Sequence, residues 1–368
     1  MRYLLTGGGT GGHVYPALAV ANDIRRRQPD AEFLYVGVRG RLEERAVPAA
    51  GYPLRFVSSR PFPRTFSPIP LLLFALSLGR GLLAALVLML QFRPDIIFAT
   101  GGFASAPIML AFGILKRTGL TKARVFLYEP NALPGMLNHV VGRLADRIGV
   151  AFEEAGRWFD MKRVAVVGYP VRREVLNVDR TEARQRLGID TGSDVILVTG
   201  GSNGSRVINE ALVGALPALR ARDGLIIFHV TGRYSGADYD AVADTEKRLH
   251  EVDRGGVQGP WYRRIDYADD IWDLYAAADI VVCRAGAGTL TEVCLSGLAA
   301  VVVPLATSAE DHQAANAREL EKRGAVRVLY QGAVWNPAGT VDSTLDSGQL
   351  AAELIALLDA PELRQQLV

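Results

Sequence analysis

The chain has 368 residues, a formal net charge of +2 at neutral pH and a hydrophobic share of 49%. This length predicts two domains, and the small net charge without a dominant Lys/Arg block gives no reason to expect a nucleic-acid partner. Two cysteines exclude a disulfide framework, and the first residues lack the basic and apolar regions of a secretory signal, so we expect a protein of the reducing cytoplasm.

Short β-branched runs alternate with longer amphipathic stretches along the whole chain. Strand, helix and strand in repetition predict right-handed βαβ units and parallel sheets. About thirteen strands exceed one comfortable sheet, so we expect them to split into two sets. The predicted strands are residues 3–7, 32–38, 54–59, 95–101, 124–129, 147–152, 163–168, 194–200, 225–232, 264–267, 279–286, 299–305 and 326–330.

Each half of the chain is predicted to begin in the same way, with a strand, a Gly-rich turn and a helix; the turns are TGGGTGG at 6–12 and TGGSNGS at 199–205. The predicted fold class is therefore α/β, with two Rossmann-like domains that contain parallel sheets. We place the first domain at 1–165 and the second at 166–346. The amphipathic stretch 347–368 is expected to form a C-terminal helix that packs back on the first domain.

Four Gly-rich turns follow predicted strands, at 6–13, 100–107, 199–205 and 284–292. Bare backbone at a helix start lets N–H groups point at an anion, which the helix dipole also favours. One such turn is explained by close packing of strand on helix, but four indicate a ligand cleft beyond the carboxyl ends of the strands.

The first turn also matches the dinucleotide pattern G-x-G-x-x-G at Gly7, Gly9 and Gly12. That pattern requires an acidic residue after the second strand to bind the ribose. Here the second strand ends with Arg39 and Arg41 instead. These arginines suit the 2′-phosphate of NADP, so an NADP-dependent oxidoreductase stays a weakened alternative.

Five segments together resemble the MurG family of N-acetylglucosaminyltransferases. They are TGGGTGGHVYP (6–16), YEPNALPG (128–135), VVGYPVRREV (166–175), VTGGSNGSRVINE (198–210) and the stretch 283–325 that begins CRAGAGTLTE. The resemblance implies a GT-B fold, two Rossmann-like domains facing a cleft. It also implies inverting transfer of GlcNAc from UDP-GlcNAc to the 4-hydroxyl of MurNAc in lipid I, which gives lipid II and UDP in peptidoglycan synthesis. No cofactor and no metal ion are implied.

Two residues are candidates for the catalytic base. The helix dipole favours the neutral imidazole of His13, which can then take a proton from an attacking hydroxyl. The alternative is a histidine that caps the helix or touches phosphate. Glu129 lies at a strand end in YEPNALPG. It is either a second base, a group that orients His13, or a turn residue that binds local N–H groups.

The resemblance also implies binding residues. Glu292 would bind the ribose, Arg172 the charge on departing UDP, Ala268 the uracil edge, and Gln313 or its neighbour His312 the GlcNAc hydroxyls. The full donor set is Thr10, Gly11, Gly12, Asn131, Arg172, Ser202, Ala268, Gly286, Ala287, Gly288, Thr289, Leu290, Thr291, Glu292 and Gln313. The acceptor diphosphate set is Gly8, Gly9, Gly101 and Gly102. Asp238–Tyr239–Asp240 matches the metal-binding motif D-x-D, but the polar residues around it predict an exposed helix start.

The stretch 69–92 is long and apolar enough to span a bilayer, with Arg80 as its one charge. Arg80 at its centre and its place inside a βαβ unit argue against a span. A buried crossover helix and a partly exposed helix that touches the membrane both remain open. Arg60, Arg64 and two Phe residues upstream suit anionic lipid, so we expect peripheral binding of region 60–92 to the cytoplasmic face of the bacterial plasma membrane.

Partners expected from the resemblance are UDP-GlcNAc, lipid I, the membrane surface and other proteins of cell-wall synthesis or division. Two further alternatives stay open. A UDP-GlcNAc 2-epimerase of the same fold would turn over UDP-GlcNAc without an acceptor. A non-catalytic partner of a split transferase would not transfer sugar alone, although donor and acceptor motifs in one chain argue against it.

Overall fold

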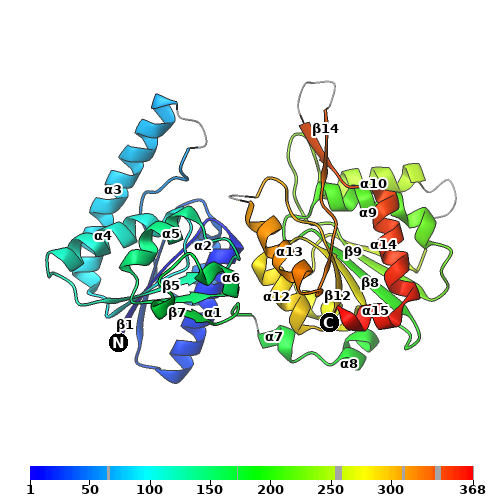
Figure 1. Ribbon diagram of the computed structural model, residues 1–368, viewed down its shortest axis with the longest axis horizontal. Helices are drawn as coiled ribbons and strands as arrows, with labels where there is room; N and C mark the ends of the chain where they lie inside the picture. Colours follow the sequence, from blue (N-terminus) through cyan, green and yellow to red (C-terminus); the bar gives the residue numbers. More distant parts are fainter. Residues whose placement is uncertain (64–66, 172, 253–258, 309–310, 336–340, 368) are drawn as a thin grey trace. The chain divides into compact units, whose positions relative to one another are not determined.

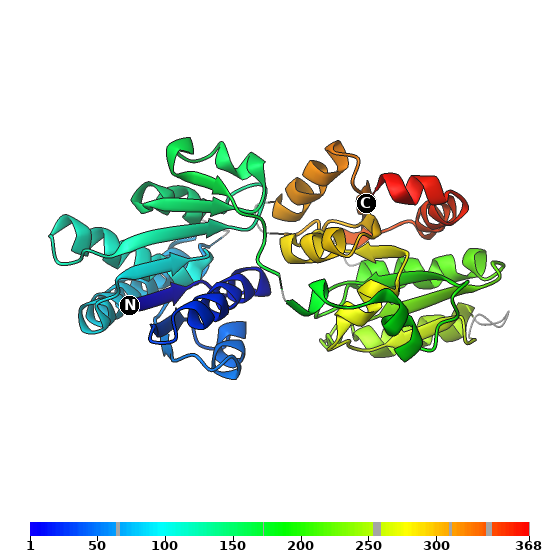
Figure 2. The ribbon, with the colours of Figure 1, turned by 90° about the horizontal axis from the view of Figure 1, so that it is seen from below.

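The computed structural model describes residues 1–63, 67–171, 173–252, 259–308, 311–335 and 341–367. Its contacts divide the chain into two units, Met1–Val171 and Arg172–Val368. Each unit is a parallel sheet with helices on both faces (Figures 1 and 2). The expected fold class, with two Rossmann-like domains, is therefore confirmed, and a strand overlaps each of the thirteen predicted ranges.

The first unit holds a seven-stranded sheet in the order β3-β2-β1-β4-β5-β6-β7. Its strands are β1 (Arg2–Thr6), β2 (Glu32–Gly37), β3 (Leu54–Phe56), β4 (Ile96–Ala99), β5 (Arg124–Glu129), β6 (Arg147–Val150) and β7 (Val164–Val166). Its helices are α1 (Gly11–Arg27), α2 (Leu42–Ala49), α3 (Pro68–Phe92), α4 (Ala106–Arg117), α5 (Met136–Val141) and α6 (Glu153–Gly156), with short 3-10 turns η1 (Phe103–Ser105), η2 (Gly142–Leu144) and η3 (Met161–Arg163).

Alternation along the strands builds two cores in this unit, because successive side chains point to opposite faces of a sheet. Leu5 of β1 packs with Ala17 of α1 and Val47 of α2 on one face. Leu4 packs with Phe112 of α4 on the other face. Helices cover both faces of the sheet, so the strands are continuous apolar runs. A ligand can therefore reach the sheet only at the strand ends.

The second unit holds a six-stranded parallel sheet in the order β10-β9-β8-β11-β12-β13. Its strands are β8 (Asp194–Thr199), β9 (Leu225–Val230), β10 (Tyr262–Ile265), β11 (Ile280–Cys283), β12 (Ala299–Val302) and β13 (Arg327–Val328). Its helices are α7 (Arg173–Leu176), α8 (Arg180–Arg186), α9 (Arg206–Leu219), α10 (Ala241–Val252), α11 (Ile271–Ala277), α12 (Ala287–Leu295), α13 (His312–Lys322), α14 (Ser347–Asp359) and α15 (Pro361–Gln366).

A two-stranded antiparallel sheet, β14 (Gly332–Trp335) with β15 (Val341–Thr344), was not predicted. Figure 1 shows it as a hairpin that projects from the second unit. Trp335 in β14 has 76% of its surface exposed. A short antiparallel hairpin has no helix between its strands, so it does not fit the strand–helix–strand pattern of the rest of the chain.

The structure differs from two expected boundaries. The strand at 163–168 forms β7, which pairs with β6, so the first unit runs to Val171 rather than to 165. The C-terminal segment 347–368 was expected on the first domain. Instead α14 lies along α9, and its Leu350 and Leu354 are wholly buried in the core of the second unit. Burial of this apolar face stabilises the second unit.

Candidate functional site

Two Gly-rich turns of the first unit meet where the neighbouring strands β1 and β4 end. Gly102 has a φ of +73°, and a Cβ atom there would lie 2.5 Å from the carbonyl oxygen of Gly8 and 3.1 Å from Cδ2 of His13. Only glycine fits so close a backbone approach. The structure therefore brings together three predicted residues from turns about ninety positions apart in the chain.

His13 lies at the third position of α1, between these two turns. Its Nδ1 is 2.6 Å from the carbonyl oxygen of Thr100, and the Thr100 hydroxyl donates to the carbonyl oxygen of His13 at 2.7 Å. A carbonyl only accepts, so Nδ1 is the donor; when the ring is neutral, the lone pair is therefore on Nε2. Thr100, which the sequence analysis did not single out, thus sets the tautomer that a general base needs.

Thr10 is the N-cap of α1, and its side chain makes no capping bond. The first turn of α1 contains no acidic residue. The N–H groups of Gly11 and Gly12 donate to no acceptor in the described ranges. A helix start with open donors and no neutralising carboxylate is suited to an anionic group.

Glu43 at the start of α2 contacts the first glycine turn, and no sequence pattern indicated this contact. Its side chain is fully buried, and its carboxylate accepts hydrogen bonds from the N–H groups of Gly9 and Val38, both at 3.1 Å. A Cβ at Gly8 would lie 2.3 Å from its Oε1. The N–H of Gly9 is therefore already used, and the predicted anion contact of Gly9 must come from other atoms of the turn.

Glu129 ends β5 and organises the loop that follows it. Its carboxylate accepts from the backbone N–H of Asn131 at 2.9 Å, from that of Gly135 at 3.1 Å and from Nδ2 of Asn138 at 2.8 Å. Burial raises its pKa to about 7, and these hydrogen bonds oppose the rise. Of the roles considered, this geometry favours the turn residue that binds local N–H groups over a second base.

Asn131 also donates from Nδ2 to Glu129, at 3.3 Å. Its side chain is held by the same carboxylate that shapes its backbone. Asn138 is 2% exposed, and a Cβ at Gly101 would lie 2.7 Å from its amide. The loop after β5 is thus packed against the second glycine turn, so all predicted residues of the first unit lie along the ends of β1, β4 and β5.

In the second unit, the turn after β11 leads into α12 with Gly286 as its N-cap. The N–H groups of Ala287, Gly288 and Thr289 donate to no acceptor in the described part of the chain, and the first turn has no acidic residue. This is a second helix start with the properties of an anion site. Leu290 is 1% exposed in the core, so only its backbone can face a ligand.

Two other donor candidates on α12 differ in what their side chains do. The Thr291 hydroxyl donates to the carbonyl oxygen of Ala287 at 2.9 Å, within the helix. Glu292 is partly exposed one turn into α12. The ribose contact of Glu292 stays a prediction.

The remaining donor candidates follow three other strands of the same sheet, β8, β10 and β12. Ser202 is exposed in the turn after β8, and Ala268 lies between β10 and α11 against the core. Gln313 on α13 accepts from the N–H of Leu305 at 3.0 Å, which leaves its Nε2 to donate. All three lie at the carboxyl ends of strands, as expected for a ligand edge. Arg172 lies outside the described residues.

Asp238–Tyr239–Asp240 forms the approach to α10. The Asp240 carboxylate accepts from the N–H groups of Val242 and Ala243, at 3.1 and 2.8 Å, and so caps the helix. These hydrogen bonds hold the pKa of Asp240 below its usual value. The motif is an exposed helix start, as the sequence predicted.

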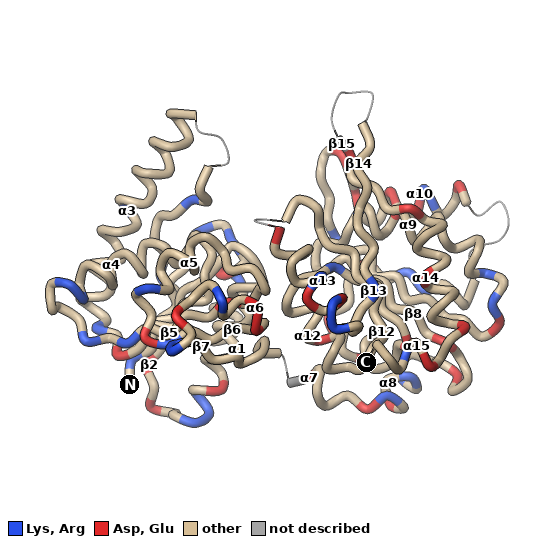
Figure 3. The backbone as a smooth tube through the Cα atoms, viewed as in Figure 1, with Lys and Arg blue, Asp and Glu red and all other residues tan. Residues whose placement is uncertain are grey.

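Helix α3 is mostly exposed, which contradicts the buried crossover interpretation. Only 17% of its most apolar window is buried, although the helix is long and apolar enough to cross a membrane. Its buried residues form one stripe, Ser77, Gly81, Ala85 and Met89, at a spacing of four. Figure 3 shows little charge along the helix. The exposed large side chains on it are Ile69, Leu72, Leu73, Leu76, Leu83, Val87 and Leu90.

Family models match both units. The N-terminal domain of glycosyltransferase family 28 matches residues 3–150, and the C-terminal domain of the same family matches residues 195–346. Each match falls within one of the two units and includes its glycine turns.

Two similar proteins carry the same full name, UDP-N-acetylglucosamine--N-acetylmuramyl-(pentapeptide) pyrophosphoryl-undecaprenol N-acetylglucosamine transferase. The one from Desulforudis audaxviator is 40% identical over 333 residues, 89% of this chain and 85% of the relative. The one from Desulfitobacterium hafniense strain Y51 is 36% identical over 374 residues, 98% of this chain and 92% of the relative.

Solved structures of similar proteins show the same fold. The MurG structure from Acinetobacter baumannii has a TM-score of 0.72 and 26% identity, covering 100% of this chain and 93% of that one. A putative UDP-N-acetylglucosamine 2-epimerase from Listeria monocytogenes has a TM-score of 0.64 at 12% identity, covering 100% and 90%, and shows only the shared fold. The chain therefore belongs to the MurG family of N-acetylglucosamine transferases that its sequence motifs resemble, and it is a glycosyltransferase.

Proposed function

We propose that this enzyme transfers GlcNAc from UDP-GlcNAc to the 4-hydroxyl of MurNAc in lipid I, which yields lipid II and UDP. The hydroxyl oxygen attacks the anomeric carbon of GlcNAc from the face opposite UDP. A bond from that oxygen to the anomeric carbon forms, the bond from this carbon to the phosphate oxygen breaks, and the configuration inverts. The hydroxyl proton leaves to a base, and the bonding electron pair leaves with UDP.

The observation that carries this proposal is the His13–Thr100 hydrogen bond between the two glycine turns. It supports His13 as the base, since Nε2 of this tautomer accepts the hydroxyl proton. The resulting imidazolium stays hydrogen-bonded to the Thr100 carbonyl through Nδ1. Glu129 then acts on catalysis indirectly, by holding the loop that presents Asn131 to the donor sugar.

The start of α12 supports a donor site in the second unit. The open N–H groups of Ala287, Gly288 and Thr289 suit the diphosphate, and they gain strength as charge develops on departing UDP. Glu292 accepts hydrogen bonds from the ribose hydroxyls, a role that carboxylates fill in related nucleotide sites. The glycine turns of the first unit suit the diphosphate of lipid I.

The test is UDP release from UDP-GlcNAc in EDTA, with and without a lipid I analogue. We expect release only with the analogue, and a loss of about 10²- to 10⁴-fold in turnover for His13→Ala, the range for a general base. His250→Ala, which alters an exposed histidine on α10, is the matched control. Epimer formation without the analogue would replace the transferase with an epimerase, and full turnover by His13→Ala would remove the base.

We further propose that the enzyme works at the cytoplasmic face of the membrane as a peripheral protein. The exposed apolar side chains of α3 support this location, because a lipid-linked acceptor remains in the bilayer. Arg60 is exposed just upstream, where a cation suits anionic headgroups. Arg64 and Phe66 lie outside the described residues. We also propose that the enzyme contacts other proteins of cell-wall synthesis or division at this membrane.

A further inference from the structure

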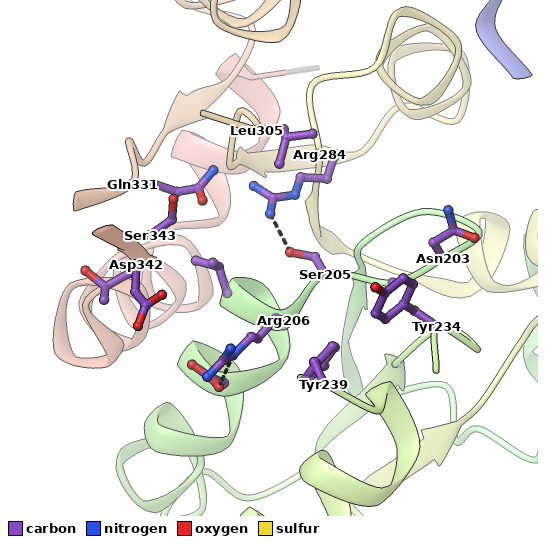
Figure 4. A pocket seen from close by; sticks show the side chains of 14 residues that line it. Asn203, Ser205, Arg206, Tyr234, Tyr239, Arg284, Leu305, Gln331, Asp342 and Ser343 are labelled. Carbon is purple, nitrogen blue, oxygen red and sulfur yellow. Dashed lines mark hydrogen bonds and ion pairs between the residues drawn. The ribbon is translucent and has the colours of Figure 1, made fainter. Parts of the chain in front are cut away.

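We propose that the second unit carries another ligand site, a pocket that binds a small molecule through a carboxylate or phosphate group. The pocket has a volume of about 420 Å³. Figure 4 shows its walls, which come from the start of α9, the turn before α10, the end of β11 and the β14–β15 hairpin. None of the predicted donor residues lines it, and the proposal does not depend on the transferase reaction.

The pocket lies over the opposite face of the sheet from α12. Side chains of α9 and α14 pack with Val198 and Val282, whereas Leu290 of α12 packs with Leu197 and Cys283. Successive residues of a strand alternate between faces. Arg284 follows Cys283, so its side chain turns to the α9 face and away from the α12 start.

Arg284 is the group that points to an anion. Its Nη2 donates to the Ser205 hydroxyl at 2.6 Å, and its Nη1 donates to the carbonyl oxygens of Val303 and Pro304 at 3.2 and 3.3 Å. Within the described ranges it pairs with no carboxylate. Burial lowers its pKa to about 10, so it stays charged near neutral pH. A largely buried cation with neutral partners is stabilised by an anion that reaches it.

The surrounding walls add donors and limit the ligand's charge. The N–H groups of Arg206 and Val207 donate to no acceptor among the described residues. Arg206 itself is bound to Glu210 at 2.9 Å, so that carboxylate is already neutralised. Asp342 stands on the hairpin side in Figure 4. A second anionic group would meet Asp342, so the site favours one oxyanion over a polyphosphate.

Tyr234 and Tyr239 give the pocket an aromatic wall. Their rings stack with centroids 6.3 Å apart and planes 20° from parallel. The Tyr239 hydroxyl accepts from Nδ2 of Asn209 at 2.8 Å, which fixes that ring. Both rings report on the pocket, since an anion at Arg284 changes their environment.

The experiment is an NMR titration of the full-length protein labelled with ring-¹³C tyrosine. Tyr234 and Tyr239 signals are assigned from Tyr→Phe variants. Inorganic phosphate and acetylglycine are the two probes for the two oxyanion sources, and acetylglycinamide is the uncharged control. We expect saturable shifts at both tyrosines with at least one oxyanion, no saturable shift with the amide, and shifts that persist in saturating UDP.

Variants locate the site. Arg284→Gln is expected to weaken oxyanion binding at least tenfold. Arg263→Gln is the matched control, because Arg263 also donates to backbone carbonyls, those of Leu187 and Gly188, but does not line the pocket. Ser343→Glu adds a negative charge to the wall without removing Arg284, and it serves if Arg284→Gln fails to fold.

The proposal would be overturned by three outcomes. The first is the absence of saturable shifts with both oxyanions. The second is loss of the shifts when UDP is added, which would assign the bound ion to the start of α12. The third is binding by folded Arg284→Gln, or by Ser343→Glu, that equals binding by the unmodified protein.

Discussion

At the residue scale, Glu43 determines the shape of the first glycine turn. Glutamine at this position has one acceptor oxygen, so its NH₂ group would face either the Gly9 or the Val38 N–H. Hydrogen bonds to charged groups contribute about 1.5–3 kcal/mol. We expect Glu43→Gln to lower the free energy of unfolding by about 2–3 kcal/mol and turnover at least tenfold. Urea unfolding and the UDP-release assay measure both.

The neighbouring Glu44 supplies the control for Glu43. Its exposed carboxylate accepts from the N–H of Gly40, in the turn between β2 and α2, rather than from an N–H of the first glycine turn. Glu44→Gln should therefore leave turnover unchanged. If Glu43→Gln were as stable and as active as the unmodified enzyme, the glycine turn would not depend on its carboxylate.

His229 predicts how stability depends on pH. It is fully buried, its Nδ1 accepts from the Tyr262 hydroxyl at 2.7 Å, and its Nε2 donates to Oδ1 of Asn209 at 3.1 Å. Burial lowers its pKa to about 3. Between about pH 6.5 and pH 3, His229 is protonated in the unfolded chain but stays neutral in the folded chain. This contribution to stability is complete above pH 6.5 and falls as the solution becomes more acidic.

The measurement is urea unfolding of the second unit between pH 8 and pH 4.5. His229→Phe removes the hydrogen-bond partner of the Asn209 Oδ1 atom and of the Tyr262 hydroxyl, so it should be less stable at pH 8. The difference in the free energy of unfolding between the two proteins should then shrink as pH falls, because only the unmodified chain contains the histidine whose protonation favours unfolding. A difference that stays constant with pH would show that folding does not lower the pKa of His229.

Sequence reasoning found the residues that belong to local patterns. His13 and the glycines stand in one turn, and their spacing alone predicts a helix start that faces an anion. Glu43 and Arg284 gave no such signal. In the sequence, Glu43 is an ordinary acidic residue at a helix start. Its contact with the first glycine turn arises only because β2 lies beside β1. Arg284 was passed over inside RAGAGTLTE, because only the strand alternation shows that it faces α9.

At the scale of elements, α14 shows what amphipathic patterns leave open. The pattern in 347–368 predicts a helix with one apolar face, and it does not name the surface that covers this face. The partner is α9, whose buried side includes Leu212 and Leu216. The strands were easier to predict, since parallel strands buried on both faces are continuous apolar runs.

The position of α14 leads to a stability prediction. Leu354 is fully buried between α14 and the core of the second unit. We expect Leu354→Ala to lower the free energy of unfolding of that unit by about 2–5 kcal/mol, as for other buried leucines. Glu353→Ala, on the partly exposed side of the same helix, is the control. A loss confined to the first unit would return the helix to the place that the sequence analysis gave it.

At the scale of the whole molecule, the exposed side of α3 should decide where the enzyme lies in the cell. Each leucine side chain moved from water into lipid contributes about 1.5–3 kcal/mol, so two charged replacements should weaken membrane binding more than tenfold. We expect Leu76→Glu/Leu83→Glu to lose co-sedimentation with anionic vesicles. UDP release with a short-chain, water-soluble analogue should be retained. Leu76 and Leu83 are 49% and 67% exposed.

The control for α3 is Leu120→Glu, because Leu120 is 64% exposed in the same unit but lies between α4 and β5. It should sediment like the unmodified protein. Added salt should weaken binding if cations such as Arg60 contribute, since electrostatic attraction to lipid is screened within about 8–10 Å. Carbonate should release the bound protein, because a peripheral helix has no span to hold it. Protein that resists carbonate, or a double variant that still sediments, would mean that α3 inserts or that another surface binds the membrane.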